Sequence, residues 1–245
     1  MKTALITGSN RGLGLTLLKR FAEDGYDVIA HTRLFSKEWD AVCRELEKQY
    51  SIKVYNIYFD LNRKEDVEKG MQEIQDMDIP IDVLVNNAGV NASTKPLMYI
   101  TYDDLTTTFM VNYFSLTMIT KEIASIMMRG SGGSIINISS CMGGGHQPGG
   151  TCYDASKAAV NQFTRTAAQE FAPFGIRVNA VACGVMNAGM SSNLSEKSFQ
   201  KLVKASALKR PAETDEIANV VLFLASEKAS YITGSVINVE GGAIL

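Results

Sequence analysis

The chain has 245 residues, of which 46% are hydrophobic and 20% charged, and this composition excludes a disordered or fibrous protein. A net charge of −2 excludes a surface built mainly for nucleic acid or anionic lipid. The four cysteines (43, 141, 152 and 183) are not spaced as a zinc site or a disulfide framework, so we expect no metal and free thiols in a reducing, cytoplasmic compartment. The apolar runs are too short for a membrane span, and we expect no signal peptide before the first strand.

Short apolar segments alternate with longer helical patterns along the chain. In chain order we expect a strand at 3–7, a helix at 13–24, a strand at 27–32, a helix at 39–50, a strand at 53–59, a helix at 64–75, a strand at 82–87, a helix at 103–128, a strand at 134–139, a helix at 153–171, a strand at 177–182, helices at 197–205 and 214–225, and a last strand at 235–240. The strands are Val- and Ile-rich without polar alternation, which is typical of a parallel sheet covered on both faces. The alternation therefore predicts one α/β domain over residues 1–245, doubly wound, with helices on both faces.

A glycine-rich loop, TGSNRGLG at 7–14, joins the first expected strand to the first expected helix. Glycines allow a tight turn and close approach of a ligand, and a helix start offers N–H groups to an anion, so the loop favours a dinucleotide pyrophosphate. An ordinary strand–helix turn is the alternative. The residues expected to contact the cofactor here are Gly8, Ser9, Asn10, Arg11, Gly12, Leu13 and Gly14.

The second expected strand ends in AHTRLF, with Thr32 and Arg33 where an NAD site usually has an acidic residue. Two guanidinium groups, on Arg33 and Arg11, would suit a 2′-phosphate, so NADP(H) is preferred to NAD(H). The alternative is that Arg33 is a solvated loop residue. Asp60, after the third strand, is expected either to bond the adenine amino group or to cap a helix.

Tyr153 and Lys157 lie four residues apart in the stretch TCYDASKAAV, near the start of an expected helix, so they share one face. An ammonium beside a phenol would favour the phenolate and lower its pKa, which would make the pair an acid/base catalyst. Taken alone, each residue also has a purely structural interpretation. Ser140 at the end of the fifth strand and Asn112 in the middle of a long helix complete the candidate catalytic set.

Together, the loop, NNAG (86–89), Asn112, Ser140 and the Tyr153–Lys157 pair resemble the short-chain dehydrogenase/reductase family, from Thr3 to the terminal VEGGAIL. Within the family the chain is most similar to 3-oxoacyl-[acyl-carrier-protein] reductases of fatty acid biosynthesis. The resemblance implies a Rossmann-type sheet of about seven parallel strands in the order 3-2-1-4-5-6-7.

The resemblance implies that Tyr153 donates a proton while NADPH delivers hydride to a carbonyl carbon. Lys157 would stabilise the phenolate and bond the nicotinamide ribose, and Ser140 would bond the substrate oxygen. Asn112 would open its helix and hold a water that relays protons to Lys157. Further implied cofactor contacts are Leu61, Asn87, Ala88, Gly89, Gly184 and Val185, besides Asp60, Tyr153 and Lys157, although NNAG also suits a purely structural role.

The stretch VACGVMNAGM departs from the family pattern. Cys183 stands where the family commonly has proline, and Ala188 where it has a threonine that bonds the nicotinamide carboxamide. The Val185 backbone can still bond the carboxamide. Asn187, Ser191 or Ser192 are candidates to replace the missing hydroxyl.

The substrate is expected among residues 91–97, 141–150 and 186–202, in contact with Ser140, Tyr153, His146, Met186 and Met190. A mobile lid is expected at about 186–205, and its apolar residues suit an acyl or hydrophobic ketone. Cys141 and Cys152 flank the catalytic residues with His146 between them, so a Cys–His nucleophile is an alternative.

The resemblance also implies a homotetramer, paired through the helices at 103–128 and 153–171. Arg129 favours docking of an acidic acyl-carrier protein, whereas Phe174, where these reductases often carry a basic residue, argues against it. Two alternatives to a carbonyl reductase stay open: an alcohol, sugar or steroid dehydrogenase of the same family, and a catalytically quiet dinucleotide-binding sensor.

Overall fold

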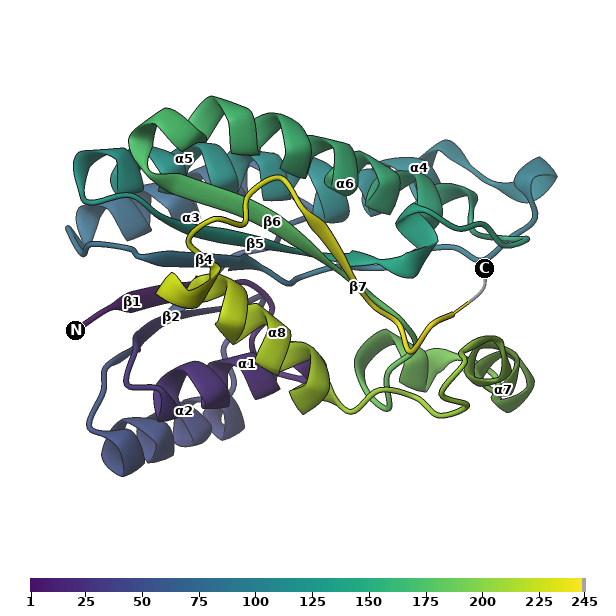
Figure 1. Cartoon of the computed structure of the whole chain (residues 1–245), viewed down its shortest axis with the longest axis horizontal. Helices are drawn as coiled ribbons and strands as arrows, with labels where there is room; N and C mark the ends of the chain where they lie inside the picture. Colours follow the sequence, from purple (N-terminus) through teal and green to yellow (C-terminus); the bar gives the residue numbers. More distant parts are fainter. Residues whose placement is uncertain (244–245) are drawn as a thin grey trace.

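The computed structural model describes residues 1–243, and residues 244–245, to which the expected domain also extends, lie outside the described part. Seven strands form a single parallel sheet in the order β3-β2-β1-β4-β5-β6-β7, which confirms the predicted fold class (Figure 1). The strands are β1 (Thr3–Ile6), β2 (Asp27–Thr32), β3 (Val54–Tyr58), β4 (Val83–Asn86), β5 (Gly133–Ser140), β6 (Ile176–Cys183) and β7 (Val236–Val239).

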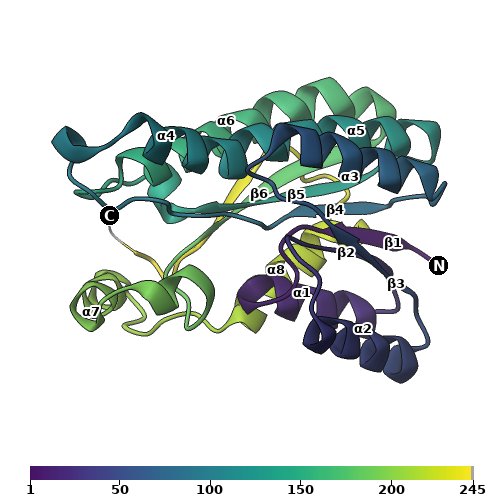
Figure 2. The ribbon, with the colours of Figure 1, turned by 180° about the vertical axis from the view of Figure 1, so that it is seen from behind.

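Helices cover both faces of the sheet, and Figures 1 and 2 show the two layers from opposite sides. One layer holds α1 (Gly12–Glu23), α2 (Lys37–Tyr50) and α8 (Thr214–Ala225). The other holds α3 (Lys64–Asp76), α4 (Tyr102–Phe109), α5 (Ser115–Arg129) and α6 (Thr151–Phe171). Short 3-10 helices η1 (Leu97–Tyr99), η3 (Cys141–Gly143), η4 (Ala172–Phe174), η5 (Gly189–Asn193) and η6 (Glu227–Ala229) lie in the connections, and α7 (Glu196–Ala205) follows η5.

Each layer buries its own hydrophobic cluster against the sheet. Leu17, Leu18 and Phe21 of α1 are fully buried on one side, whereas Ile119 and Ile123 of α5 are buried on the other. Burying a side chain of this size contributes about 1.5–3 kcal/mol. The two clusters explain why the strands carry apolar residues on both faces.

The helix expected at 103–128 is interrupted. A π-helical segment, η2 (Met110–Phe114), separates α4 from α5, and Asn112 lies at its centre. A π turn widens the helix locally and leaves backbone groups out of the ordinary pattern, so the expectation that Asn112 opens its helix agrees with the structure.

Strand order reverses direction beside β1, whose neighbours are β2 and β4. In open parallel sheets of this kind ligands bind beyond the carboxyl ends of the strands near such a reversal. The Gly-rich loop, Ser140 and Cys183 all lie at the carboxyl ends of the strands. Helix α7 and the start of α4 lie at the same end of the sheet (Figures 1 and 2).

Within residues 1–243, no helix is both long enough and apolar enough to span a membrane.

Candidate active site

Ser140, Tyr153 and Lys157 come together at the carboxyl end of β5. Ser140 is the last residue of the strand, and its Oγ accepts a hydrogen bond from the backbone N–H of Met142 at 3.2 Å. Tyr153 and Lys157 lie one turn apart in α6, and the Lys157 Nζ is 5.8 Å from the centre of the Tyr153 ring. The same Nζ donates to the backbone oxygen of Ile138 in β5 at 2.8 Å, which ties the lysine to the strand that carries Ser140.

Burial shifts the pKa values of both α6 residues towards their neutral forms. It raises the pKa of Tyr153 above its ordinary value, while hydrogen bonding with Ser140 acts in the opposite direction. Burial lowers the pKa of Lys157 to about 8, and the side chain is only 3% exposed. The expectation that Lys157 lowers the pKa of Tyr153 is therefore not met in the chain alone, because desolvation of the phenol is the largest effect.

Asn112 uses its whole side-chain amide to fix a neighbouring loop. Its Oδ1 accepts from the N–H of Val90 at 2.8 Å, and its Nδ2 donates to the Val90 oxygen and to Ser156 Oγ, both at 2.9 Å. A Cβ at Gly89 would lie 3.4 Å from Asn112 Oδ1 and 3.5 Å from Lys157 Nζ, so Gly89 lies beside both. No sequence pattern indicated Ser156 as a partner of Asn112.

The Gly-rich loop has the features that a pyrophosphate requires. Helix α1 begins at Gly12 with no side-chain cap and no acidic residue in its first turn, so its first N–H groups are available to an anion. Gly8 has φ +66°, a conformation that favours glycine. A Cβ on Gly14 would lie 2.0 Å from Gly8 O, so this position leaves no room for a side chain.

Other residues of the loop are divided between core and solvent. Asn10 and Arg11 are exposed, Ser9 is buried, and Leu13 packs its side chain into the α1 cluster. Leu13 can therefore contact a cofactor only through its backbone.

The NNAG segment holds the loop from behind. Asn87 Nδ2 donates to Thr7 O at 2.8 Å and Gly8 O at 3.1 Å, and the N–H groups of Asn87 and Ala88 both donate to Thr7 Oγ1 at 3.0 Å. Asn86 is buried and donates to Asn137 and Thr120 at 2.9 Å. These hydrogen bonds give the NNAG segment a structural role.

Arg11 and Arg33 are both exposed at the cofactor edge, and within residues 1–243 neither forms an ion pair with a carboxylate. Thr32 is buried and its Oγ1 donates to Leu34 O at 3.0 Å.

Asp60 is not a helix cap, because α3 begins after Arg63. Its Oδ1 instead accepts the Asn62 N–H at 2.9 Å. The buried Leu61 turns its carbonyl oxygen to Ser115 Oγ.

The departures from the family pattern lie at the end of β6. Cys183 is buried and pairs in register with Ser140, so it belongs to the site. Gly184 lies against Glu240, where a Cβ would come within 2.7 Å of backbone. Val185 O accepts from Ala212 N–H at 2.9 Å, while Ala188 precedes η5, whose Gly189 backbone lies against Gly12.

The expected substrate residues are placed unequally. His146 is exposed in a loop and Met190 is exposed in η5, whereas Met186 is partly buried against the α1 cluster. Ser191 and Ser192 lie in η5, and the backbone N–H of Asn187 donates to Ala212 O at 3.0 Å.

The cysteines show no sign of nucleophilic activation. Burial raises the pKa of Cys141 and of Cys152, and it raises the pKa of Cys183 to about 12. Burial also raises the pKa of the Asp154 carboxyl, against the opposing hydrogen bond from the Gln147 N–H. A thiolate–imidazole pair is therefore not supported.

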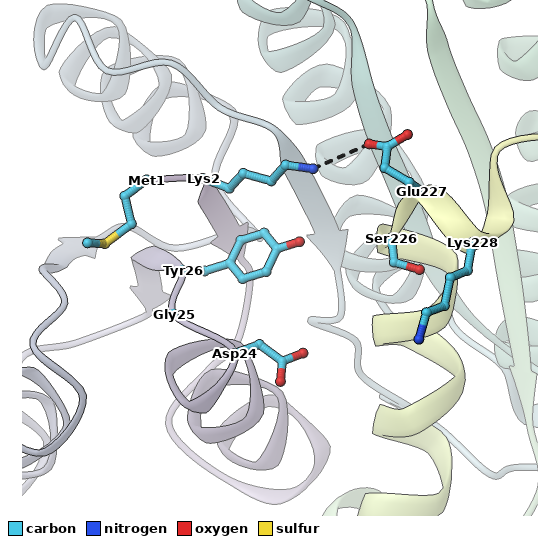
Figure 3. Close-up of a pocket in the computed structure, with 8 residues that line it drawn as sticks. All are labelled: Met1, Lys2, Asp24, Gly25, Tyr26, Ser226, Glu227 and Lys228. Atoms are coloured by element: carbon cyan, nitrogen blue, oxygen red, sulfur yellow. Dashed lines mark hydrogen bonds and ion pairs between the residues drawn. The ribbon is translucent and has the colours of Figure 1, made fainter.

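An open cleft lies at the opposite end of the sheet, near the amino ends of β1 and β2 (Figure 3). Lys2, Tyr26 and Glu227 line it, and Lys2 Nζ lies 3.3 Å from Glu227 Oε1. It has no part in the site described above. Among the described residues, no group of three or more His, Cys, Asp or Glu side chains is arranged to hold a metal ion.

Comparison with known proteins agrees with this geometry. A family model described as enoyl-(acyl carrier protein) reductase matches residues 8–243. The 3-oxoacyl-[acyl-carrier-protein] reductase FabG of Aquifex aeolicus is 37% identical over 241 residues, covering 98% of this chain and 96% of the relative. FabG of Thermotoga maritima is 38% identical over 248 residues, covering 100% of this chain and 98% of the relative.

A crystal structure of a blue fluorescent protein from a metagenomic library, in complex with NADPH, superposes with a TM-score of 0.90 at 33% identity, and the match covers 98% of this chain and 97% of that one. The family match, the relatives and the arrangement of Ser140, Tyr153 and Lys157 all agree, and the chain belongs to the short-chain dehydrogenase/reductase family of oxidoreductases.

Proposed function

We propose that the chain is an NADPH-dependent carbonyl reductase, with 3-oxoacyl thioesters on an acyl carrier protein as its substrate class. The observation that carries the proposal is the meeting of Ser140, Tyr153 and Lys157 beside the Gly-rich loop. The names of the relatives at 37–38% identity over nearly the whole chain support the substrate class.

Each residue has a definite task in the proposed reaction. When bound, the reduced nicotinamide supplies a hydride to the carbonyl carbon. Tyr153 is protonated at neutral pH because burial raises its pKa, so it is ready to give its proton to the carbonyl oxygen. Ser140 Oγ accepts from Met142 N–H, so its own hydrogen can turn from Tyr153 to that oxygen as negative charge develops.

Lys157 stabilises the phenolate that forms when Tyr153 loses its proton. With a pKa of about 8 the amine is still mostly protonated at neutral pH, yet it can release a proton easily. One of its three hydrogens goes to Ile138 O, so two are left for the phenolate and the cofactor ribose.

The preference for NADPH rests on Arg33 and Arg11, two exposed guanidinium groups without carboxylate partners in residues 1–243. Charge-assisted bonds to a 2′-phosphate would satisfy them. The NADPH complex of the related fluorescent protein supports this choice.

The substrate, on this proposal, binds between the loop of His146 and a lid at 186–205 that carries Met186 and Met190. The lid would close over the Gly-rich loop, which its Gly189 already touches at Gly12. We also propose a cytoplasmic homotetramer. The four cysteines are free, which agrees with a reducing compartment. Phe114 at the end of η2 and Met118 in α5 are exposed and suit a subunit contact.

A catalytically inactive dinucleotide-binding protein is the second candidate. It is favoured by Cys183 and Ala188, which depart from the family pattern beside the expected nicotinamide position. A dehydrogenase working towards the ketone would use the same residues in reverse. Turnover separates these functions, measured as NADPH oxidation with acetoacetyl thioesters and simple ketones and as NADP⁺ reduction with alcohols.

The decisive variant is Tyr153→Phe. Loss of a general acid lowers turnover about 10²–10⁴-fold, while NADPH affinity, measured by titration, stays within about twofold because the hydroxyl is a minor part of the cofactor contact. Tyr102→Phe, at an 80% exposed tyrosine of α4, is the matched control and keeps normal turnover. Normal rates in Tyr153→Phe would remove Tyr153 from the mechanism.

A further inference from the structure

His31 is a buried ionisable side chain near the end of β2. It is the next-to-last residue of the strand and only 2% exposed. Its Nδ1 lies 3.2 Å from the backbone nitrogen of Gly8, its Nε2 lies 2.9 Å from the carbonyl oxygen of Phe59, and its ring centre lies 4.0 Å from the Phe59 ring centre.

These two partners determine the tautomer. A backbone N–H can only donate and a carbonyl oxygen can only accept, so Nδ1 must carry the lone pair and Nε2 the proton. A second proton on the imidazole would replace the Gly8 bond with a clash of two donors. Burial favours the neutral ring and lowers the pKa of His31 to about 4, although Asp60 and the bond to Phe59 act in the opposite direction.

Three segments assigned to the cofactor meet at this imidazole. Gly8 and Ser9 open the Gly-rich loop, and Ser9 donates both its N–H and its Oγ–H to the His31 oxygen at 3.0 Å. Thr32 and Arg33 follow His31 directly, and Asp60 follows Phe59. Backbone bonds also hold these segments, and the ring adds a side-chain link from Gly8 to Phe59.

We infer that His31 is a positioning residue for the dinucleotide: its neutral imidazole fixes the Gly-rich loop to the ends of β2 and β3. Because the Gly8 N–H is already used, the donors left for the pyrophosphate are those at the start of α1. This inference rests on the proposed function, since it assigns a residue to the cofactor site of that function.

Two substitutions divide the contacts of the ring. His31→Asn can keep an acceptor near the Nδ1 position, and His31→Gln can keep a donor near the Nε2 position. His31→Phe keeps only the ring. Ile29→Val, which removes one buried methyl group from the same strand without touching the loop, is the control for a loss of stability alone.

The experiment measures NADPH affinity by titration, and thermal stability, in the full-length variants. We expect His31→Phe to weaken NADPH binding about tenfold or more, since it leaves the Gly8 N–H unpaired. His31→Asn should weaken it least, whereas Ile29→Val should lower the melting temperature without changing affinity. Equal NADPH affinity in the wild type and in both His31→Phe and His31→Gln would overturn the inference.

A second readout is independent of the cofactor. Nitrogen-15 NMR of labelled histidine at neutral pH should show His31 protonated at Nε2 alone, and a proton on Nδ1 would also overturn the inference. A wild type that binds no NADPH would refute the proposed function, while the NMR result would still decide how the ring is held.

Discussion

Replacing Asn112 with alanine should destabilise the fold substantially. The side chain is fully buried and makes three hydrogen bonds, two with the Val90 backbone and one with Ser156. Each neutral bond contributes about 1 kcal/mol, so the free energy of unfolding should fall by about 3 kcal/mol. Total stabilities of about 5–15 kcal/mol make this a large fraction.

Urea unfolding at one fixed chain concentration measures the change, followed by the fluorescence of Trp39, the single tryptophan in the sequence. Amide hydrogen exchange at Val90 provides a local readout, which should accelerate in the variant. Ser125→Ala is the control, because its hydroxyl bonds only the Lys121 oxygen of its own helix, and it should change stability by no more than about 0.5 kcal/mol. A loss below about 1 kcal/mol with unchanged exchange at Val90 would refute the reasoning, because it would mean that these bonds contribute little.

Two further predictions concern charge. Arg33→Ala should weaken binding of NADPH about 10–100-fold and binding of NADH by no more than about twofold, since only NADPH offers a 2′-phosphate for charge-assisted bonds. Equal losses of affinity for the two cofactors, or a similar effect of the control variant Lys37→Ala, would contradict the role of Arg33. The pKa of His31 is about 4 instead of its usual 6.5, so the fold favours the neutral ring. This stabilisation is complete above about pH 6.5 and is lost as the pH falls through 4. The wild type should therefore lose stability relative to His31→Asn between these pH values, as measured by denaturant unfolding. Parallel curves of stability against pH for the two proteins would contradict this prediction.

Much of the fold could be predicted because the strands have a simple pattern. The strand at 27–32 and the helix at 214–225 match the structure at both ends. The helix at 103–128 was predicted as continuous, yet the structure divides it at Met110–Phe114. Helical periodicity cannot reveal this break, because Asn112 is held by Val90, which is distant along the chain.

The site was less accessible to prediction. The spacing of Tyr153 and Lys157 indicated a shared helix face, but their pKa values depend on burial that no local pattern records. The sequence prediction did not include His31, although a histidine directly after the apolar run Val28–Ala30 of a strand was a visible signal. Its partners come from two other segments of the chain, and only the tertiary structure identifies them.

The central place of β1 in the sheet affects how the protein must be made. β1 ends at residue 6, but its second neighbour, β4, begins only at residue 83. At about 5–20 residues per second, a ribosome needs roughly 4–15 s to synthesise the intervening chain. During that time one side of the earliest strand has unpaired backbone groups, so the nascent chain is exposed to wrong pairing until β4 has been synthesised.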